Sequence, residues 1–497
     1  MNEKLNDALN GIGDKHIQEA ARPRKRRPYW IAAVAAVLAM VILLSALWKP
    51  SVDDPVIQGT NPTGHTTQPT DHPDDDPTQP TGEVQLSQCV AAPTYPTMMT
   101  KPNRSDYSDT GAFYEDLRIW TAAMEELYDQ PEGYADSLEH FFGASISEFL
   151  TGEENQAYSP VNVYLAMAML AETTGGNSRQ QILDLFGLES IEELREQASH
   201  VWNAHYRDDG ETTSLLANSL WLDHQYSFHQ NTVDLLAEHY YASTFHGDLG
   251  TEPINEQLRS WLNEQTGGLL EEQTKEIELP PRTVFALAST IYFKAGWAGG
   301  FVKEFTADDV FHTPDGDKTV PFMKDNVSGA IYYGSNFKAA CLELSGDNGM
   351  WIILPNEGVT VAEVLAGDEY LKLTLDPDSW KNRSDVMLEV KLPKFDVSSK
   401  CDLIEGMQNL GLTDIFDPNF SDFTPMTDHE RLRVSHIDHA ARVAIDEEGI
   451  VAAAFTLIVV EDESAPAPVD FTVDRPFLFV VSSQDNLPLF AGVVTEP

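Results

Sequence analysis

The sequence predicts an α+β protein built on a large, mostly antiparallel sheet system. Two observations carry this prediction: helical patterns come first in the folded part of the chain, and long strand-like runs follow them. No second linker interrupts the chain after about residue 108, so residues 108–497 are predicted to form one domain. A chain of 497 residues is long enough to bury a core of that size.

The helical part is recognised by its apolar period. Large apolar side chains recur at helical spacing at Leu138, Phe141, Phe142, Ile146 and Phe149. The next helix is predicted to begin at Ser159-Pro160, with Ser159 as its N-cap and Pro160 at its first position. Strand-like runs follow at residues 284–293, 350–354, 387–392, 477–481 and 489–494.

The N-terminal region predicts a membrane anchor. A basic cluster at residues 22–27 precedes an uncharged segment bounded by Trp30 and Trp48, which is just long enough to cross a hydrocarbon core about 30 Å thick. We therefore expect a cytoplasmic basic tail over residues 1–28 and a transmembrane signal-anchor helix over residues 29–48. The alternative is a cleaved signal peptide, although Ser45-Ala46-Leu47 makes a poor cleavage site.

Residues 49–107 are rich in Pro, Thr, Asp and Gly, and they predict a disordered, semi-extended stalk because such a composition cannot bury enough apolar surface to fold. Within it, the acidic run at residues 74–76 has the carboxylates that calcium prefers. It lacks the spaced ligands and the glycine of a calcium-binding loop, so a solvated charge run is favoured.

Composition excludes several classes of function. The formal net charge is −47, from 79 acidic against 32 basic residues, which argues against nucleic acid as a partner because no basic stripe remains to neutralise phosphates. The three cysteines have no CxxC spacing. We find no hydrolase, zinc-protease, P-loop or dinucleotide-binding motif, so we expect no catalytic residues, no metal and no cofactor, and the chain is not expected to be an enzyme.

Residues 447–464 combine the composition of a strand with the boundaries of a loop. From Ile450 to Val460, alternate residues are small or apolar, as on the buried face of a strand. The segment nevertheless lies between Gly449 and a Pro-rich stretch at residues 464–468. An ordinary buried strand is one interpretation, and an exposed functional loop is the other, because local conflicts of this kind tend to mark function.

Several motifs in order along residues 134–497 resemble those of the serpin family. They are Ser159-Pro160-Val161-Asn162, Gly176-Asn177-Ser178-Arg179-Gln180-Gln181-Ile182-Leu183, Ala217-Asn218-Ser219-Leu220-Trp221, Ile291-Tyr292-Phe293-Lys294 with Trp297, Leu392-Pro393-Lys394-Phe395, Leu410-Gly411-Leu412-Thr413-Asp414-Ile415-Phe416, and Phe471-Thr472-Val473-Asp474-Arg475-Pro476-Phe477-Leu478-Phe479. The resemblance implies a serpin fold with three β-sheets, eight to nine helices and an exposed reactive-centre loop at about residues 447–470.

The resemblance also assigns roles to residues. The hinge of the loop is expected to comprise Glu447, Gly449, Ile450, Ala452, Ala453 and Ala454. Its small residues suit insertion between two strands, which favours an inhibitory member, although Ile450 and Phe455 are larger than the family usually has there. The breach, where the main sheet opens, is expected at Trp297, Lys394 and Glu447. The shutter, at the middle of that sheet, is expected at Ser159, Asn162, Ser289 and His439, with Ser289 where the family usually has asparagine.

The resemblance implies a suicide-substrate inhibitor of serine endopeptidases, or of cysteine endopeptidases, which traps the acyl-enzyme by inserting its cleaved loop into the main sheet. Counting along the loop in the family's register places the reactive bond at Glu463–Ser464, which suits a glutamyl-specific target. Asp462, Val460 and Val459 are alternatives, the last two for an elastase-like enzyme.

The rival interpretation is a non-inhibitory serpin-like binding or adhesion module displayed on the cell surface. We expect a monomer whose partners are the target endopeptidase, in a covalent complex, and the membrane. The expected location is the cell membrane of a bacterial-type host, with the N-terminus cytoplasmic and the serpin domain extracellular.

Overall fold

The structure, a computed structural model, describes residues 88–450 and 468–497, all of them within one unit of the chain, residues 81–497. The described residues form eleven α-helices: α4 (Thr110–Tyr128), α5 (Asp136–Phe149), α6 (Pro160–Thr173), α7 (Gly176–Leu185), α8 (Ile191–His205), α9 (Gln230–His239), α10 (Glu252–Gln265), α11 (Glu271–Thr274), α12 (Val361–Leu365), α13 (Glu369–Leu375) and α14 (Ile404–Asn409).

The strands of the same residues are β1 (Gln88–Ala91), β2 (Gln156–Tyr158), β3 (Arg207–Asp208), β4 (Thr212–Asp223), β5 (Ala242–Gly247), β6 (Phe285–Gly296), β7 (Ala307–Thr313), β8 (Gly316–Tyr333), β9 (Phe337–Leu344), β10 (Asn348–Pro355), β11 (Arg383–Pro393), β12 (Phe395–Asp402), β13 (Asp438–Asp446), β14 (Gly449–Ile450), β15 (Val469–Thr472), β16 (Phe477–Ser482) and β17 (Pro488–Val494).

Two sheets organise these strands. The main sheet has the order β1-β5-β4-β6-β14-β13-β12, with β3 paired to β4. The second sheet has the order β15-β11-β8-β9-β10-β16-β17-β2, with β7 paired to β8. Every residue of β10, β16 and β17 is buried, which explains why these strands read as continuous apolar runs in the sequence.

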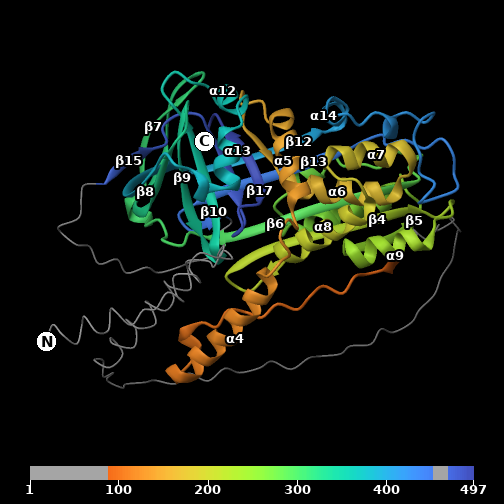
Figure 1. Cartoon of the computed structure of the whole chain (residues 1–497), viewed down its shortest axis with the longest axis horizontal. Coiled ribbons are helices and arrows are strands. Elements are labelled where there is room, and N and C mark those ends of the chain that lie inside the picture. Colours follow the sequence, from red (N-terminus) through yellow and green to blue (C-terminus); the bar gives the residue numbers. More distant parts are fainter. Residues whose placement is uncertain (1–87, 451–467) are drawn as a thin grey trace, which may run out of the picture. The chain divides into compact units, whose positions relative to one another are not determined.

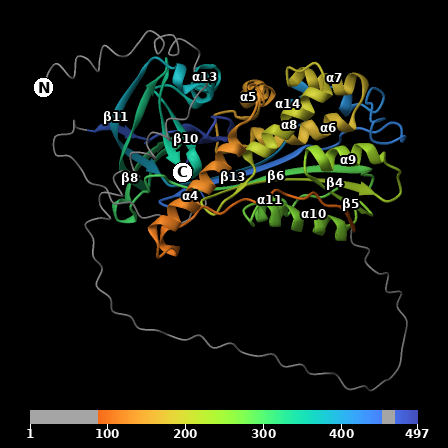
Figure 2. The same ribbon diagram turned by 60° about the horizontal axis from the view of Figure 1, so that its bottom comes forward.

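Helices cover the main sheet on both faces. Figure 1 shows α6, α8 and α9 over β4, β5 and β6, and Figure 2 shows α10 and α11 on the opposite side of the same strands. Helix α6 lies in the core, and all its residues except Ala166 are buried, as expected for a helix that is apolar all round. Its predicted start is confirmed: Ser159 is the N-cap, and Pro160 occupies the first turn.

The predicted α+β class is confirmed, but two of the expected counts differ from the structure. The described residues form two hydrogen-bonded sheets rather than three, because the 18-residue strand β8 pairs with β7 and β11 along most of its length and with β9 at its end. The described helices number eleven rather than eight to nine. The additional helices include α4, which lies before the first helix that the apolar pattern predicts, and the one-turn helix α11.

The upper limit of the predicted stalk was also wrong, because residues 88–107 belong to the folded unit. Strand β1 extends the edge of the main sheet by pairing with β5. Beyond it, the ring of Tyr95 stacks on Trp202 and Tyr206 of the α8 region, at centroid distances of 5.7 and 5.5 Å. The polar composition of this stretch led to the wrong prediction. Its attachment depends on the backbone pairing of β1 with β5 and on the stacked ring of Tyr95, and neither is visible in the composition.

Candidate functional site

The first residues of the expected hinge already form a strand within the main sheet. Strand β14, residues Gly449 and Ile450, lies between β13 and β6 and pairs antiparallel with both. Gly449 has φ of 136°, and a Cβ atom at this position would lie 2.3 Å from the carbonyl oxygen of Ala295. Only glycine fits here. The side chain of Ile450 is 3% exposed.

Beyond β14, strands β6 and β13 separate. In the described part of the chain, β6 pairs only with β4 and β14, and β13 pairs only with β12 and β14. A cavity of about 770 Å³ occupies this region. Ser289 and Ile291 of β6, Ala441 and Val443 of β13, and Ile450 at the end of β14 help to line it. Among the described residues, the facing edges of β6 and β13 beyond β14 therefore have no partner strand, which is the geometry that accepts an added strand.

The turn before β14 is held by the residues expected at the breach. The Glu447 carboxylate is buried and accepts hydrogen bonds from Lys394 Nζ and Thr306 Oγ1, both at 2.8 Å. Burial alone raises the pKa of this carboxyl, but the bonds from Lys394 and Thr306 outweigh it, and the pKa lies below its usual value. The indole of Trp297 donates to the carbonyl of Asp446 at 2.8 Å.

The structure therefore brings Trp297, Lys394 and Glu447 together, while their role in opening the sheet stays a prediction. Sequence reasoning missed two further contributors to the same turn. Thr306 is the second donor to Glu447, and Lys303 Nζ pairs with the Glu448 carboxylate at 2.8 Å. Both precede β7, and no local pattern links them to a turn more than a hundred residues later.

The residues expected at the shutter lie where β13 faces the start of α6. His439 is buried, and its Nε2 accepts a hydrogen bond from the backbone N–H of Ser159 at 3.1 Å. The ring is therefore neutral with its proton on Nδ1, and burial lowers its pKa to about 4. Ser159 Oγ donates to the carbonyl of Leu489 at 2.8 Å and accepts from the backbone N–H of Asn162.

Ser289 does not join that hydrogen-bonded group, although it lines the same cavity as Asn162 and His439. Its hydroxyl is buried with no protein partner among the described residues. The side-chain oxygen of Asn218, directly opposite on β4, is equally unpaired. A buried polar atom without a partner carries a desolvation cost, so both side chains offer an unused hydrogen-bonding group at this point of the sheet.

Comparison with known proteins decides the family. The family model for serpins, described as serine protease inhibitors, matches residues 140–497. This chain belongs to the serpin family. Members are generally protease inhibitors, and some, such as thyroxine-binding globulin, are not.

Among curated relatives, this serpin is 30% identical to serpin-ZXA of Oryza sativa subsp. japonica over 69% of its own length and 90% of the relative. An uncharacterized serpin-like protein of Methanosarcina acetivorans is 28% identical, with 69% and 82% covered. Among solved structures, the thermophilic serpin tengpin in its native state is similar with a TM-score of 0.67 at 23% identity, over 74% of this chain and 95% of that chain.

Several predicted features fall outside the residues that the structure describes. They are the hinge alanines Ala452, Ala453 and Ala454, the reactive-bond candidates Val459, Val460, Asp462, Glu463 and Ser464, the tail over residues 1–28 and the anchor over residues 29–48. Among the helices of the described residues, none is both long and apolar enough to cross a membrane.

Proposed function

We propose that this serpin is a suicide-substrate inhibitor of serine endopeptidases and, through the same acyl-enzyme chemistry, of cysteine endopeptidases. The observation that carries the proposal is the position of β14, whose two residues pair between β6 and β13 at one end of a gap whose edges have no other partner among the described residues. A strand that continued from Ile450 along that gap would find hydrogen-bonding edges on both sides.

The chemical step begins when the target's nucleophile attacks the carbonyl carbon of Glu463. The Glu463–Ser464 amide bond breaks, Ser464 leaves as a new amino terminus, and an acyl bond joins Glu463 to the enzyme. Residues from Ile450 onward then extend β14 through the gap. At about 3.3 Å per residue, roughly 14 inserted residues would carry the attached enzyme about 45 Å, which distorts its catalytic geometry and stalls deacylation.

The free energy that drives this insertion comes from the contacts that the new strand makes in the main sheet. An inserted strand would form on the order of ten backbone hydrogen bonds, each contributing roughly 1 kcal/mol net. The apolar face that begins at Ile450 would also fill the cavity between β6 and β13. The side-chain oxygens of Ser289 and Asn218 have no partner among the described residues, and Ser289 lines the cavity that an inserted strand would fill.

The test mixes the full-length chain, in detergent, with glutamyl endopeptidase, elastase, subtilisin, trypsin and an aspartate-specific protease. We expect a complex at the summed mass that survives denaturing electrophoresis, and a released peptide that begins at Ser464. A peptide that begins at Glu461 would move the reactive bond to Val460. Cleavage at any bond without a stable complex would support the non-inhibitory alternative instead.

The matched variant for this test is Gly449→Ala. A Cβ at residue 449 would collide with the backbone of Ala295 and Gly296, so β14 should no longer pair between β6 and β13, and the residues after it should not extend that pairing. We expect the variant to be cut at the same bond but to form at least about tenfold less complex, because hydrolysis then outpaces insertion. An unchanged yield of complex would sink the insertion mechanism.

We also propose that residues 29–48 anchor the chain in the cell membrane, with the serpin domain outside. The support is the uncharged segment between Trp30 and Trp48 behind a basic cluster. Removing residues 1–48 should release the protein from the membrane fraction on cell lysis. If the shortened chain stays with the membrane, another part of the protein holds it there.

A further inference from the structure

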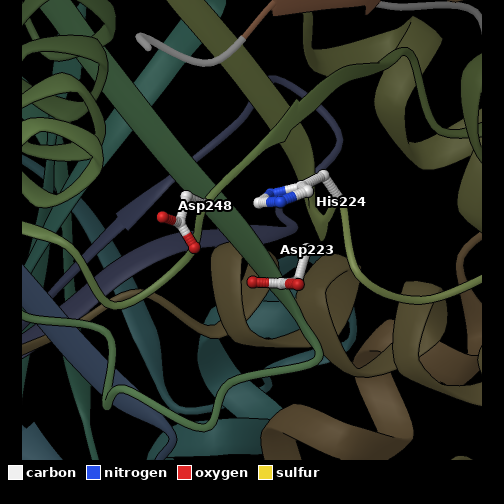
Figure 3. A group of neighbouring side chains, drawn as sticks. All are labelled: Asp223, His224 and Asp248. Carbon is white, nitrogen blue, oxygen red and sulfur yellow. The ribbon is translucent and has the colours of Figure 1, made fainter. Parts of the chain in front are cut away.

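A group of metal-ligating side chains lies at one end of the main sheet, apart from the hinge and its gap. Asp223 is the last residue of β4, His224 follows it, and Asp248 follows the last residue of β5. Because β4 and β5 are parallel, with Asp223 opposite Gly247, their carboxyl ends meet at the same edge. The ligand atoms of the three side chains all lie within 4.8 Å of one another (Figure 3).

The buried member of the group, Asp223, is held in a fixed orientation. Its side chain is almost fully buried, and its two carboxylate oxygens accept hydrogen bonds from the backbone N–H groups of Gln225, at 2.8 Å, and Leu249, at 3.1 Å. Each oxygen retains further acceptor capacity, since a carboxylate offers about four lone-pair sites. The two N–H groups therefore orient Asp223 without exhausting it as a ligand.

The ring of His224 is prepared in the tautomer that binds metals. Its Nδ1 lies 3.2 Å from the carbonyl oxygen of Gly247, which also accepts the backbone N–H of His224 at 2.9 Å. A carbonyl only accepts, so Nδ1 carries the proton and Nε2 carries the lone pair. Metal-binding histidines typically donate their second nitrogen to a backbone carbonyl in this way. In the described residues, Nε2 of His224 has no hydrogen-bond partner.

The charge of the group is unbalanced. Neither Asp223 nor Asp248 makes an ion pair with a lysine or arginine in the described part of the chain, so two carboxylates face each other without a cation. Their mutual repulsion is stronger where one of them is buried, because the surroundings screen it less than water does. A divalent cation between them would convert this repulsion into attraction for both carboxylates.

We propose that Asp223, His224 and Asp248 bind one divalent transition-metal ion of the zinc type, which cross-links the ends of β4 and β5. One imidazole nitrogen and two carboxylate oxygens suit zinc with water in the fourth position, and His224 and Asp248 are exposed, which leaves that position open. Calcium fits less well, because it prefers six to eight oxygen ligands.

The bound ion would also steady the helix that covers this face of the sheet. Thr251 Oγ1 donates to the carbonyl of Asp248 at 2.7 Å, and Thr251 is the N-cap residue of α10. Leu249 packs with Ile254 and Leu258 of α10 against Trp221 of β4. Sequence analysis predicted no metal because the ligands come from the ends of two strands and form no local motif.

The experiment titrates the chelator-treated full-length chain with Zn²⁺ by calorimetry, and with Co²⁺ by visible absorption. The variants His224→Ala and Asp248→Asn remove the exposed ligands, and His140→Ala, an exposed histidine on α5, is the matched control. Asp223 is left intact because its carboxylate also holds the local backbone.

We expect one Zn²⁺ per chain whose affinity falls at least about tenfold in His224→Ala and Asp248→Asn but not in His140→Ala. Zn²⁺ should also raise the thermal midpoint of the chain and of the control, and should not raise it in the two ligand variants. If the ligand variants bind Zn²⁺ as the chain does, the ion sits elsewhere and the proposal fails. Binding of Ca²⁺ in place of Zn²⁺ would overturn the assignment of the metal class.

Discussion

His439 couples the middle of the main sheet to pH. Its pKa is lowered by burial to about 4, below the usual value near 6.5, so the unfolded chain binds the proton more readily. The contribution of a neutral His439 to stability is therefore complete above about pH 6.5 and is lost as the pH falls toward 4. The hydrogen bond from Ser159 N–H to Nε2 disappears when the ring is protonated.

We predict that lowering the pH from 7 to 5 costs about 2 kcal/mol through this residue alone. The measurement is the denaturant midpoint of the chain against that of His439→Asn, which has no titratable ring. The difference between the two proteins isolates His439 from the other groups that titrate in this range. Parallel pH profiles would show that His439 contributes no pH dependence.

The ion pair between Lys394 and Glu447, in the turn before β14, leads to a second prediction about a single residue. Glu447 is 6% exposed, so Lys394→Ala leaves a buried carboxylate with Thr306 as its one side-chain donor among the described residues. We predict a loss of about 1–3 kcal/mol in the free energy of unfolding. Lys303→Ala is the control, because Lys303 is exposed and its pair with Glu448 should contribute little to stability. Equal losses in both variants would contradict this account.

At the scale of elements, the segment around β1 and α4 lies before the residues that match the family. It attaches to the main sheet at several points. Lys101 pairs with Glu211, the backbone N–H of Lys101 donates to the carbonyl of Asp209 at 2.7 Å, and Arg207 donates to the hydroxyl of Tyr128 in α4. The segment thus joins the edge of the sheet to the turn that precedes β4.

We predict that Tyr95→Ala destabilises the folded chain by about 1–3 kcal/mol, because it removes the ring that stacks on Trp202 and Tyr206. Val90→Ala, on the same segment, changes a side chain that is 57% exposed and should have little effect. Thermal unfolding of both variants is the measurement. A neutral Tyr95→Ala would mean that the segment adds no stability to the sheet.

For the whole molecule, the net charge of −47 should affect the rate at which the proposed target protease associates. Such a charge attracts cationic proteins toward this serpin, and salt screens the attraction. We predict that the association rate with a basic target protease falls by at least about tenfold between low and physiological ionic strength. An acidic protease with the same specificity is the control, and its association rate should not fall. A salt-independent rate with the basic protease would exclude steering.

The elements most accurately predicted from sequence were those with a strong apolar pattern. Helix α5, the start of α6 and the strands β6, β10, β11, β16 and β17 were expected close to where they lie, because their side chains repeat with the period of the structure that buries them. Strand β1 and helix α4 were missed, since both are polar or only partly buried and depend on contacts with distant residues.

The residues of the candidate site were likewise anticipated only where a sequence motif marks them. Glycine at residue 449 and the pairing of Lys394 with Glu447 were anticipated through motifs, although the functional roles of these residues stay predictions. Thr306, Lys303 and the unpaired hydroxyl of Ser289 were not anticipated, because each depends on the register of strands that are far apart in the chain.

Local patterns and motifs were enough to predict the fold class, the family and the candidate hinge, because short stretches of the chain carry those features. The pairing of β14 between β6 and β13, the cavity that follows it, and the meeting of Asp223, His224 and Asp248 appear only in the three-dimensional structure. The physical reason is that these features arise from strand pairing and register. They depend on backbone hydrogen bonds between distant segments, which no local pattern of side chains specifies.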